Sequence, residues 1–309
     1  MSEAGAARRI GFVGLGNMGW PMARNLAGAG FELTVRDADP ERQERVASEL
    51  GCAAAETPAA FASVDAVITM LPTGQIVRDV LLGWEGGLAA ALAPGTVVVD
   101  MSSSEPTGTQ ELGAALAGRG VALVDAPVSG GVKGADAGTL SIMVGGDDES
   151  AIARVRPLFD VLGERLFATG PLGSGHAMKA LNNYMAAIGY AAAAEVLLVG
   201  ARFGLDPANM VDVINASSGR NTTTELMLKS QVLPRRFATG FTLALFAKDV
   251  GIAAGLADAI GIEAPFCELT RRVFAEASAG EGPGADCTAA IRYWEKLNGT
   301  ELPTTPAEG

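Results

Sequence analysis

The hydrophobic positions in the first half of the chain fall into short runs separated by helix-length segments. Six of these runs predict strands, at 10–13, 33–35, 64–70, 96–101, 121–126 and 140–146. Most of them are continuous rather than alternating, which is typical of parallel strands buried on both faces. Helices are expected between them, at 17–29, 40–50, 74–82, 106–118 and 148–161. This alternation predicts a doubly wound parallel α/β domain of the Rossmann type over residues 1–170.

The pattern changes after about residue 170. Alanine-rich segments of helical period follow one another and are interrupted by glycine or proline, as in "FGLDP", "AIGIEAP" and "GEGPGAD". We expect no strand in this part, and "TTTE" predicts a capping box from Thr222 to Glu225. The sequence therefore predicts an all-helical domain over 171–299, joined to the first domain by a long helix, and a mobile tail at 300–309.

Composition and charge narrow the class of protein. Of the 309 residues, 49% are hydrophobic and 19% charged, as in a folded globular chain long enough for two domains. A net charge of −12 argues against a nucleic-acid partner, and no run approaches the roughly 18 uninterrupted apolar residues of a membrane span. Cys52, Cys267 and Cys287 form no CxxC motif, and His176 is the single histidine. We therefore expect a cytoplasmic protein without a membrane partner or a metal site.

A glycine-rich turn follows the first predicted strand and opens the first predicted helix. The segment "GLGNMG" has the GxGxxG spacing, which in this strand–turn–helix context predicts a dinucleotide-binding site. Close backbone approach and the positive end of the helix favour the pyrophosphate. The residues expected to contact the cofactor are Gly14, Leu15, Gly16, Asn17, Met18 and Gly19.

The end of the second predicted strand indicates which dinucleotide binds. Asp37 can accept hydrogen bonds from both ribose hydroxyls of NAD and would repel the 2′-phosphate of NADP. Residue 38 is alanine, not the arginine expected in an NADP enzyme. NAD is the predicted cofactor, and NADP stays open because Arg36 can turn toward a phosphate.

A second glycine-containing stretch, 124–140, follows a predicted strand, and Pro127 and its glycines argue against a strand there. Ser129, Gly130 and Gly131 offer a hydroxyl and consecutive N–H groups that can hold a small carboxylate. An ordinary flexible loop is the alternative, and Lys133 is interpreted as a solvated lysine.

The long helix expected over 170–204 carries polar residues in its first turns. Lys179 and Asn183 are four residues apart and share one face, and Asn182 lies nearby. A lysine amine partly shielded from water gives up its proton more readily and can exchange it with a substrate oxygen. The alternative is a lysine with its amine in solvent and amides that cap loops. Gly173 and Gly175 are expected to leave room for another molecule, and His176 is interpreted as packing or supporting its neighbours.

Four motifs occur in a fixed order: "GFVGLGNMG" at 11–19, "DAPVSGG" at 125–131, "GPLGSGHAMKALNN" at 170–183 and "AKDVGIA" at 247–253. With these motifs the chain resembles the β-hydroxyacid dehydrogenase family over residues 9 to about 298. That family includes 3-hydroxyisobutyrate dehydrogenase, tartronate semialdehyde reductase and, more distantly, 6-phosphogluconate dehydrogenase.

The resemblance implies roles for individual residues. Lys179 would be the catalytic acid/base and Asn183 its substrate-orienting partner. Ser129, Gly130 and Gly131 would bind the substrate carboxylate. Further cofactor contacts would come from Leu71, Pro72, Ser103 and Lys248. The chain departs from the family pattern at Val250, where leucine is usual, and at His176, where a smaller or amide residue is common.

The activity predicted from these residues is NAD-dependent hydride transfer between a small 3-hydroxy acid and its semialdehyde. The alternatives are an NADP(H)-dependent tartronate semialdehyde or imine reductase and, from another class, a non-catalytic nucleotide sensor. Imine reduction is disfavoured by Lys179, which relatives with that activity tend to replace. Lys133, Met178, Arg220 and Asn221 are candidates for contacts to the distal end of the substrate. For the segment that holds Arg220 and Asn221, a capped helix start is the alternative. The apolar helical faces predict a homodimer or homotetramer.

Overall fold

The computed structural model describes residues 5–304 and contains two compact units, which divide between Lys179 and Ala180. The first unit is built on a sheet and the second on helices, as the sequence predicts. Each unit is described by itself.

The sheet unit has a nine-stranded sheet in the order β3-β2-β1-β4-β5-β6-β8-β7, with β9 paired to β8. The strands are β1 (Arg9–Val13), β2 (Glu32–Arg36), β3 (Ala53–Ala54), β4 (Ala66–Thr69), β5 (Val97–Asp100), β6 (Ala122–Asp125), β7 (Val128–Ser129), β8 (Leu140–Gly145) and β9 (Gly163–Gly170). The pairs from β3 to β6 are parallel, and β8 is antiparallel to both β6 and β7. All six predicted strands are present, and the sheet is mixed rather than fully parallel.

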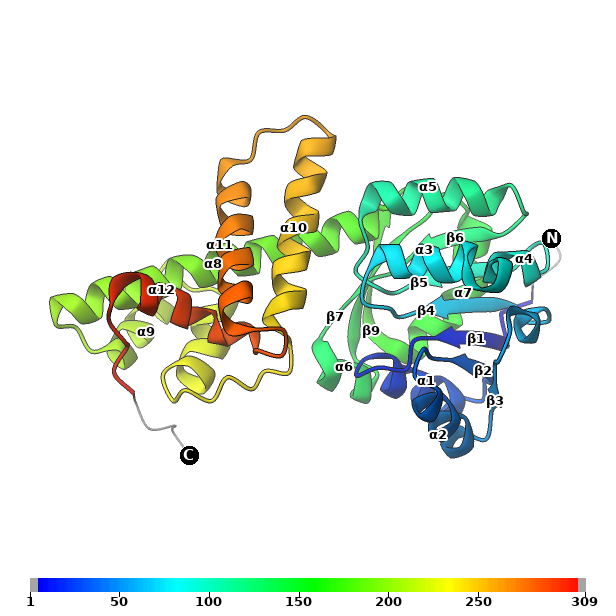
Figure 1. Cartoon of the computed structure of the whole chain (residues 1–309), viewed down its shortest axis with the longest axis horizontal. Coiled ribbons are helices and arrows are strands. Elements are labelled where there is room, and N and C mark those ends of the chain that lie inside the picture. The colour runs from blue at the N-terminus through cyan, green and yellow to red at the C-terminus, as the bar shows by residue number, and fades with distance from the viewer. Residues whose placement is uncertain (1–4, 305–309) are drawn as a thin grey trace. The chain divides into compact units, whose positions relative to one another are not determined.

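Helices cover both faces of this sheet (Figure 1). They are α1 (Gly19–Gly28), α2 (Pro40–Leu50), α3 (Gly74–Leu82), α4 (Leu88–Ala91), α5 (Pro106–Ala117), α6 (Gly131–Ala137) and α7 (Glu149–Leu162), with 3₁₀ turns η1 (Pro58–Phe61) and η2 (Trp84–Gly86). Helices α1, α2 and α7 share one buried cluster with the strands, and α3, α4 and α5 share another. A doubly wound sheet is the result.

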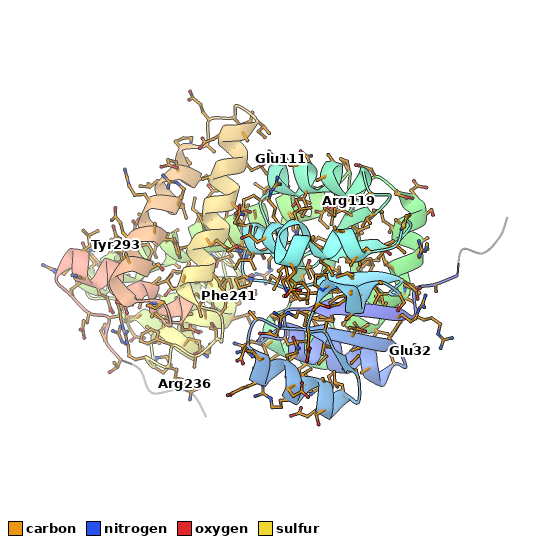
Figure 2. All side chains as sticks on the ribbon, turned by 45° about the vertical axis from the view of Figure 1, so that its right-hand side comes forward. Glu32, Glu111, Arg119, Arg236, Phe241 and Tyr293 are labelled. Atoms are coloured by element: carbon orange, nitrogen blue, oxygen red, sulfur yellow. The ribbon has the colours of Figure 1, made fainter. Side chains whose placement is uncertain are left out.

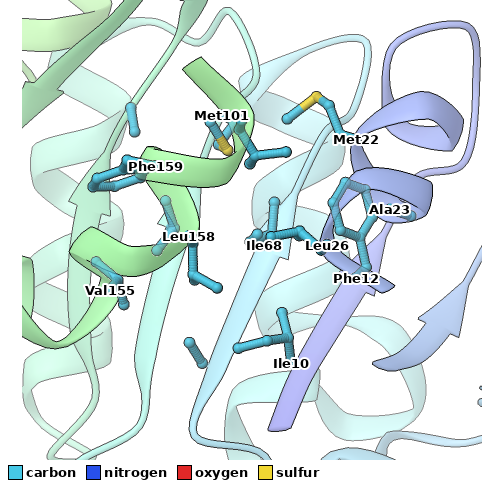
Figure 3. Close-up of a cluster of buried hydrophobic side chains, with 14 of the residues drawn as sticks. Ile10, Phe12, Met22, Ala23, Leu26, Ile68, Met101, Val155, Leu158 and Phe159 are labelled. Atoms are coloured by element: carbon cyan, nitrogen blue, oxygen red, sulfur yellow. The ribbon is translucent and has the colours of Figure 1, made fainter. Parts of the chain in front are cut away.

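Neighbouring strand residues point to opposite faces, which explains the continuous apolar runs. Ile68 of β4 packs in the cluster under α1 and α7, whereas Val67 packs under α3 and α5. Figure 3 shows the first cluster, where Phe12 and Leu26 lie near Ile68 and Leu158 closes the core from α7. Charged side chains of this unit such as Glu32 and Arg119 are exposed on the outside (Figure 2).

Several elements do not follow the sequence pattern. The stretch 124–140, expected to hold no strand, contains the two-residue strand β7, because Val128 and Ser129 pair with β8, and the seven-residue helix α6. Strand β9 was not predicted either, because its largely exposed side chains give no apolar run. It is held by its pairing with β8.

Helix α8 (Ser174–Phe203) is the long predicted helix, and the residues after it are helical. The remaining elements are α9 (Pro207–Asn215), the π-helical η3 (Thr223–Val232), α10 (Leu243–Ala259), α11 (Pro265–Glu281), η4 (Cys287–Ala290) and α12 (Ile291–Asn298). Helices α10 and α11 run side by side in this unit (Figure 1). Between residues 205 and 304 the only strand-like pairing described is a single bridge from Thr242 to Asp286.

The core of the helical unit is aromatic. Tyr190 of α8 lies against Phe274 and Trp294, with ring centroids 6.3 and 6.2 Å away. Helix α8 has the length and mean hydropathy, 1.6 over 18 residues, of a membrane span. Part of that hydrophobicity serves this core, because Leu197 and Tyr190 are fully buried.

Two expectations about local structure in this unit change. The Thr222–Glu225 capping box is wrong: Thr222 makes no side-chain cap, and Asn221 Oδ1 accepts hydrogen bonds from the N–H groups of Thr223 and Thr224 instead. Of the predicted tail, Leu302 is buried in the helical core. Residues 305–309 lie outside the described residues.

Candidate active site

The glycine-rich turn has the geometry that a dinucleotide needs. Gly14 has φ +98°, and a Cβ on Gly14 would collide with the backbone of Met70, directly after β4. A Cβ on Gly19 would collide with the Gly14 carbonyl. A Cβ at Gly16 would meet nothing within 4 Å, so this backbone is open to a ligand. The turn therefore fits a pyrophosphate at the N-terminus of α1.

Asp37, directly after β2, is held firmly beside this turn. Its carboxylate is 6% exposed and accepts hydrogen bonds from the N–H groups of Leu15 (2.7 Å) and Asp39 (2.8 Å). The guanidinium of Arg42 lies 3.3 Å from the same carboxylate, a partner that sequence reasoning missed. A fixed carboxylate next to the turn is suited to bind ribose hydroxyls.

NADP stayed open as a cofactor because Arg36 could turn toward its 2′-phosphate, but the Arg36 guanidinium contacts other residues. Its Nη1 donates to the Asp37 carbonyl (2.6 Å) and to Gln43 Oε1 (2.9 Å). Its guanidinium also lies 4.8 Å from the ring centroid of Trp84. Turning toward a 2′-phosphate would break these contacts.

The loops after β4 and β5 are tied together. Leu71 donates its N–H to the hydroxyl of Ser102 at 2.9 Å. Asp100, at the end of β5, accepts hydrogen bonds from Thr69 (2.9 Å) and from the Ser104 hydroxyl (2.7 Å). This network fixes the loops that carry three predicted cofactor contacts, which are Leu71, Pro72 and Ser103.

The predicted carboxylate-binding residues span the end of β7 and the start of α6. Ser129 pairs with Ser141 of β8, and Gly130 and Gly131 adopt positive φ at the entry to α6. A Cβ on Gly131 would meet nothing within 4 Å. These backbone groups are fixed by the sheet yet open on one side, and Lys133 beyond them is exposed.

The start of α8 packs on the sheet unit's own backbone. Asp125, at the end of β6, accepts the N–H groups of Gly173 and His176 at 2.8 Å each. The expectation that Gly173 and Gly175 leave room for another molecule is wrong: a Cβ on Gly173 would come 2.9 Å from the Pro106 carbonyl, and one on Gly175 2.8 Å from Asp125 Oδ2. Gly173 lets the start of the helix approach α5, and Gly175 lets it approach the end of β6.

His176 is inside the sheet unit, 1% exposed. Its Nδ1 is 2.8 Å from the Thr109 hydroxyl of α5, and its Nε2 is 3.6 Å from Asp100. The sequence interpretation placed it as a packing or supporting residue, and this interior position agrees with that role.

Lys179 follows one turn after His176 and is partly exposed, and Met178 beside it is exposed. Asn183 follows four residues later on the same continuous helix and is 7% exposed. Its Nδ2 donates to Asp249 of α10 at 2.6 Å, and Asp249 also lies 3.1 Å from Lys248 Nζ. Asn182 is more exposed and donates to Asn183 Oδ1 at 3.2 Å.

Arg220 and Asn221, which were considered for substrate selectivity, make contacts within their own segment. Arg220 lies 3.5 Å from Glu225 with most of its side chain exposed, and Asn221 caps η3. Sequence reasoning missed Asp100, Thr109, Asp125 and Asp249. The available signal was a carboxylate at the end of each buried apolar run, "VVVD" and "LVD", and within the "AKDV" motif.

Comparison with known proteins defines the family. Residues 9–170 match the NAD-binding domain of 6-phosphogluconate dehydrogenase, and residues 173–294 match the model described as NAD-binding of NADP-dependent 3-hydroxyisobutyrate dehydrogenase. The chain is 36% identical to 2-(hydroxymethyl)glutarate dehydrogenase of Eubacterium barkeri, over 95% of this chain and 97% of that protein. It is 35% identical to 2-hydroxy-3-oxopropionate reductase of Escherichia coli K12, over 95% and 99%.

A solved structure of Mycobacterium tuberculosis 3-hydroxyisobutyrate dehydrogenase with L-serine has TM-score 0.85 and 35% identity, over 93% of this chain and 99% of that one. The fold and the glycine-rich turn thus define an NAD(P)-dependent oxidoreductase. The chain belongs to the β-hydroxyacid dehydrogenase family and is an enzyme that acts on hydroxyacids. The alternative of a non-catalytic nucleotide sensor falls away.

Proposed function

We propose that this enzyme uses Lys179 as the general acid/base for oxidation of a small 3-hydroxy acid to its semialdehyde, and for the reverse reduction. The observation that carries the proposal is the placement of Lys179 in the first turns of α8, directly after the residues that Asp125 fixes to the end of β6. A lysine on a rigid, capped helix start is held in one place, as an acid/base group must be.

The reaction balances with one proton acceptor on the protein. In the oxidation the substrate O–H bond breaks and its proton moves to the Lys179 amine. The carbon–oxygen double bond forms as the C–H bond breaks. The bound nicotinamide supplies the hydride acceptor. In the reduction, Lys179 returns the proton to the carbonyl oxygen. We propose that Asn183 orients the same oxygen through its amide.

The substrate carboxylate is proposed to bind Ser129, Gly130 and Gly131. Support comes from the positive φ of both glycines and from the open side of Gly131. Backbone N–H groups in such a turn form an anion site without a cationic side chain.

We propose that NAD is the preferred cofactor. Asp37 is fixed next to the glycine-rich turn, and Arg36 is occupied by Gln43 and Trp84. A 2′-phosphate placed there would face a buried carboxylate. Contacts from Gly14, Leu15, Gly16, Asn17, Met18, Gly19, Leu71, Pro72, Ser103 and Lys248 to the cofactor are part of the same proposal.

A 3-hydroxyisobutyrate-like acid is the first substrate candidate. The second is NADP(H)-dependent reduction of 2-hydroxy-3-oxopropionate or a related semialdehyde, and the similarity to the E. coli reductase over nearly the whole chain favours it. Steady-state rates with 3-hydroxyisobutyrate, L-serine, 2-(hydroxymethyl)glutarate and tartronate semialdehyde, each with both cofactors, separate the two. The first predicts the highest kcat/KM for an oxidation with NAD, and a preference for semialdehyde with NADPH would overturn it.

The helical unit is proposed to form a homodimer or homotetramer. Large apolar side chains are exposed on it, among them Phe203 (84%), Val199 (71%) and Phe266 (68%). Soluble proteins seldom leave so many uncovered. Light scattering at micromolar concentration is expected to show an oligomer, and a monomer would refute the proposal. The cytoplasmic location remains a prediction.

A further inference from the structure

Two buried carboxylates lie side by side beneath the start of α8. Asp100 and Asp125 are register partners at the ends of the parallel strands β5 and β6, with 2% and 0% exposure. Like charges in an interior repel each other and lose hydration, so such a pair needs compensating donors.

Each carboxylate organises a different part of the site. Asp125 accepts the N–H groups of Gly173 and His176 and so fixes the first turn of α8. Asp100 accepts the N–H of Ser102 at 3.0 Å and the hydroxyl of Ser104 at 2.7 Å, and so fixes the loop that carries Ser103.

The imidazole of His176 lies between the two. Its Nε2 is 3.6 Å from Asp100 Oδ2, its Nδ1 is 3.9 Å from Asp125 Oδ2, and its side chain is fully buried. No other charged group packs against the ring in the described contacts: α5 contributes the hydroxyl of Thr109, 2.8 Å from Nδ1.

The contact with Thr109 indicates which ring nitrogen of His176 carries the hydrogen. The Thr109 hydroxyl either donates to Nδ1 or donates to the Glu105 carbonyl, 3.1 Å away, and accepts from Nδ1–H. In the first arrangement a neutral ring carries its hydrogen on Nε2, which then points toward the Asp100 carboxylate, whereas in the second an Nε2 lone pair would face that carboxylate. The first arrangement is therefore the one that we adopt. Nε2 makes no hydrogen bond of ordinary length in the described residues, and the carboxylate that it faces is that of Asp100, with Oδ2 at 3.6 Å.

We propose that His176 is a positioning residue for Lys179. It joins the carboxylates of Asp100 and Asp125, because its ring Nε2 faces Asp100 Oδ2 at 3.6 Å and its backbone N–H donates to Asp125 at 2.8 Å. This bridge locks the helix turn that precedes the lysine to the loop that carries Ser103. The inference rests on the acid/base role of Lys179 proposed above. Loss of the bridge leaves the two carboxylates facing each other and lets the first turn of α8 shift. A displacement of about 1 Å at a reacting group lowers kcat by up to about 100-fold.

The ring itself can be observed directly. Because His176 is the only histidine, ¹⁵N-histidine labelling of the untagged protein gives one imidazole spin system that needs no assignment. At pH 7 we expect the Nε2 chemical shift of a protonated nitrogen. An unprotonated Nε2 would overturn the proposal.

The kinetic test compares two substitutions. His176→Leu removes both polar contacts, whereas His176→Gln can still donate to Asp100 and accept from Thr109. We expect kcat to fall about 30- to 100-fold in the leucine variant and less than about 10-fold in the glutamine variant. The Kd for NAD, measured by fluorescence, should change less than about 2-fold in both, because the glycine-rich turn is untouched and Asp100 still holds the Ser103 loop through Ser102 and Ser104.

Leu158→Ala, in the core of the same unit, is the control for destabilisation alone. It should lower the unfolding midpoint and leave kcat unchanged. Unaltered kcat in His176→Leu, or an equal loss in Leu158→Ala, would overturn the inference. If the leucine variant does not fold, the ring spectrum of the wild type decides: a protonated Nε2 supports the bridge, and an unprotonated Nε2 contradicts it. Lys179→Met distinguishes the positioning role of His176 from the acid/base role of Lys179, because activity in this variant would contradict the acid/base role itself.

Discussion

The amide of Asn183 donates a 2.6 Å hydrogen bond to the buried carboxylate of Asp249, which joins α8 to α10 within the helical unit. The carboxylate also lies 3.1 Å from Lys248 Nζ. The side chain proposed to orient the substrate oxygen is therefore itself oriented, and its polar neighbour is a motif residue that sequence reasoning did not select.

Replacement of Asp249 should affect the chemical step more than cofactor binding. In Asp249→Ala, the Asn183 amide loses its acceptor and keeps only the hydrogen bond that Oδ1 accepts from Asn182. We expect kcat/KM for the hydroxy acid to fall about 10- to 100-fold. Asp212→Asn is the control, because this carboxylate bonds Lys229 on the surface. Steady-state kinetics that show equal losses in both variants would argue against an orienting role.

Cofactor preference should depend on Asp37. In Asp37→Asn the charge is removed while the shape is kept, and we expect the ratio of kcat/KM with NADP to that with NAD to rise at least about 10-fold. Arg36→Gln should change this ratio little, because Arg36 already binds Gln43 and Trp84. A large loss of NADP use in Arg36→Gln would show that the arginine does reach the phosphate.

The contribution of the Asp65 carboxylate to the stability of the fold should be lost at acid pH. Burial raises the pKa of Asp65, but the Arg9 guanidinium and the N–H groups of Arg8 and Arg9 lower it further, to about 2. Since the pKa in the folded state lies below the unfolded value of 3.8, this stabilisation is present above about pH 4 and is lost as the pH falls toward 2.

Urea unfolding of wild type and Asp65→Asn checks this sign. The wild type should have the higher free energy of unfolding at pH 7 and pH 5, and the difference between the two proteins should be smaller at pH 3. A difference that stays constant or grows at pH 3 would contradict the lowered pKa of Asp65.

The helical core should depend on one hydroxyl. Tyr190 donates to the Thr288 carbonyl at 2.6 Å, and burial raises its pKa well above 10. Tyr190→Phe removes this buried hydrogen bond and should cost about 1–2 kcal/mol of unfolding free energy. Tyr293, labelled at the edge of the helical unit in Figure 2, donates to Glu276 at 2.8 Å. Tyr293→Phe should therefore cost less, and an equal cost would be evidence against the buried bond.

Much of the sheet unit could be predicted because its signals are local. Buried strands such as β4 and β5 are uninterrupted apolar runs, and the Asp39–Pro40 start of α2 carries its own cap and helix-compatible proline. Strand β9 could not be found this way, since it is specified by pairing with β8 rather than by burial of its side chains. The cap of η3 was misassigned because the side chain that caps it belongs to Asn221, one residue before Thr222, and accepts the N–H groups of Thr223 and Thr224.

Part of the site could also be predicted because its signals are local in the sequence. Gly14, Asp37 and Lys179 lie in motifs whose spacing can be read along the chain. Asp125 and Thr109 act through α8 and α5, so their partners are distant in sequence. The close approach of Gly175 to Asp125 likewise depends on the fold, which is why the space beside it was assigned to a ligand.

Single-turnover hydride transfer with Lys179→Met tests the central claim most directly, with the exposed Lys296→Met as the matched control. NAD should bind both variants as it binds the wild type. The rate of reduced-nicotinamide formation should fall at least about 100-fold in Lys179→Met alone. A rate within a few-fold of wild type in that variant would contradict the account.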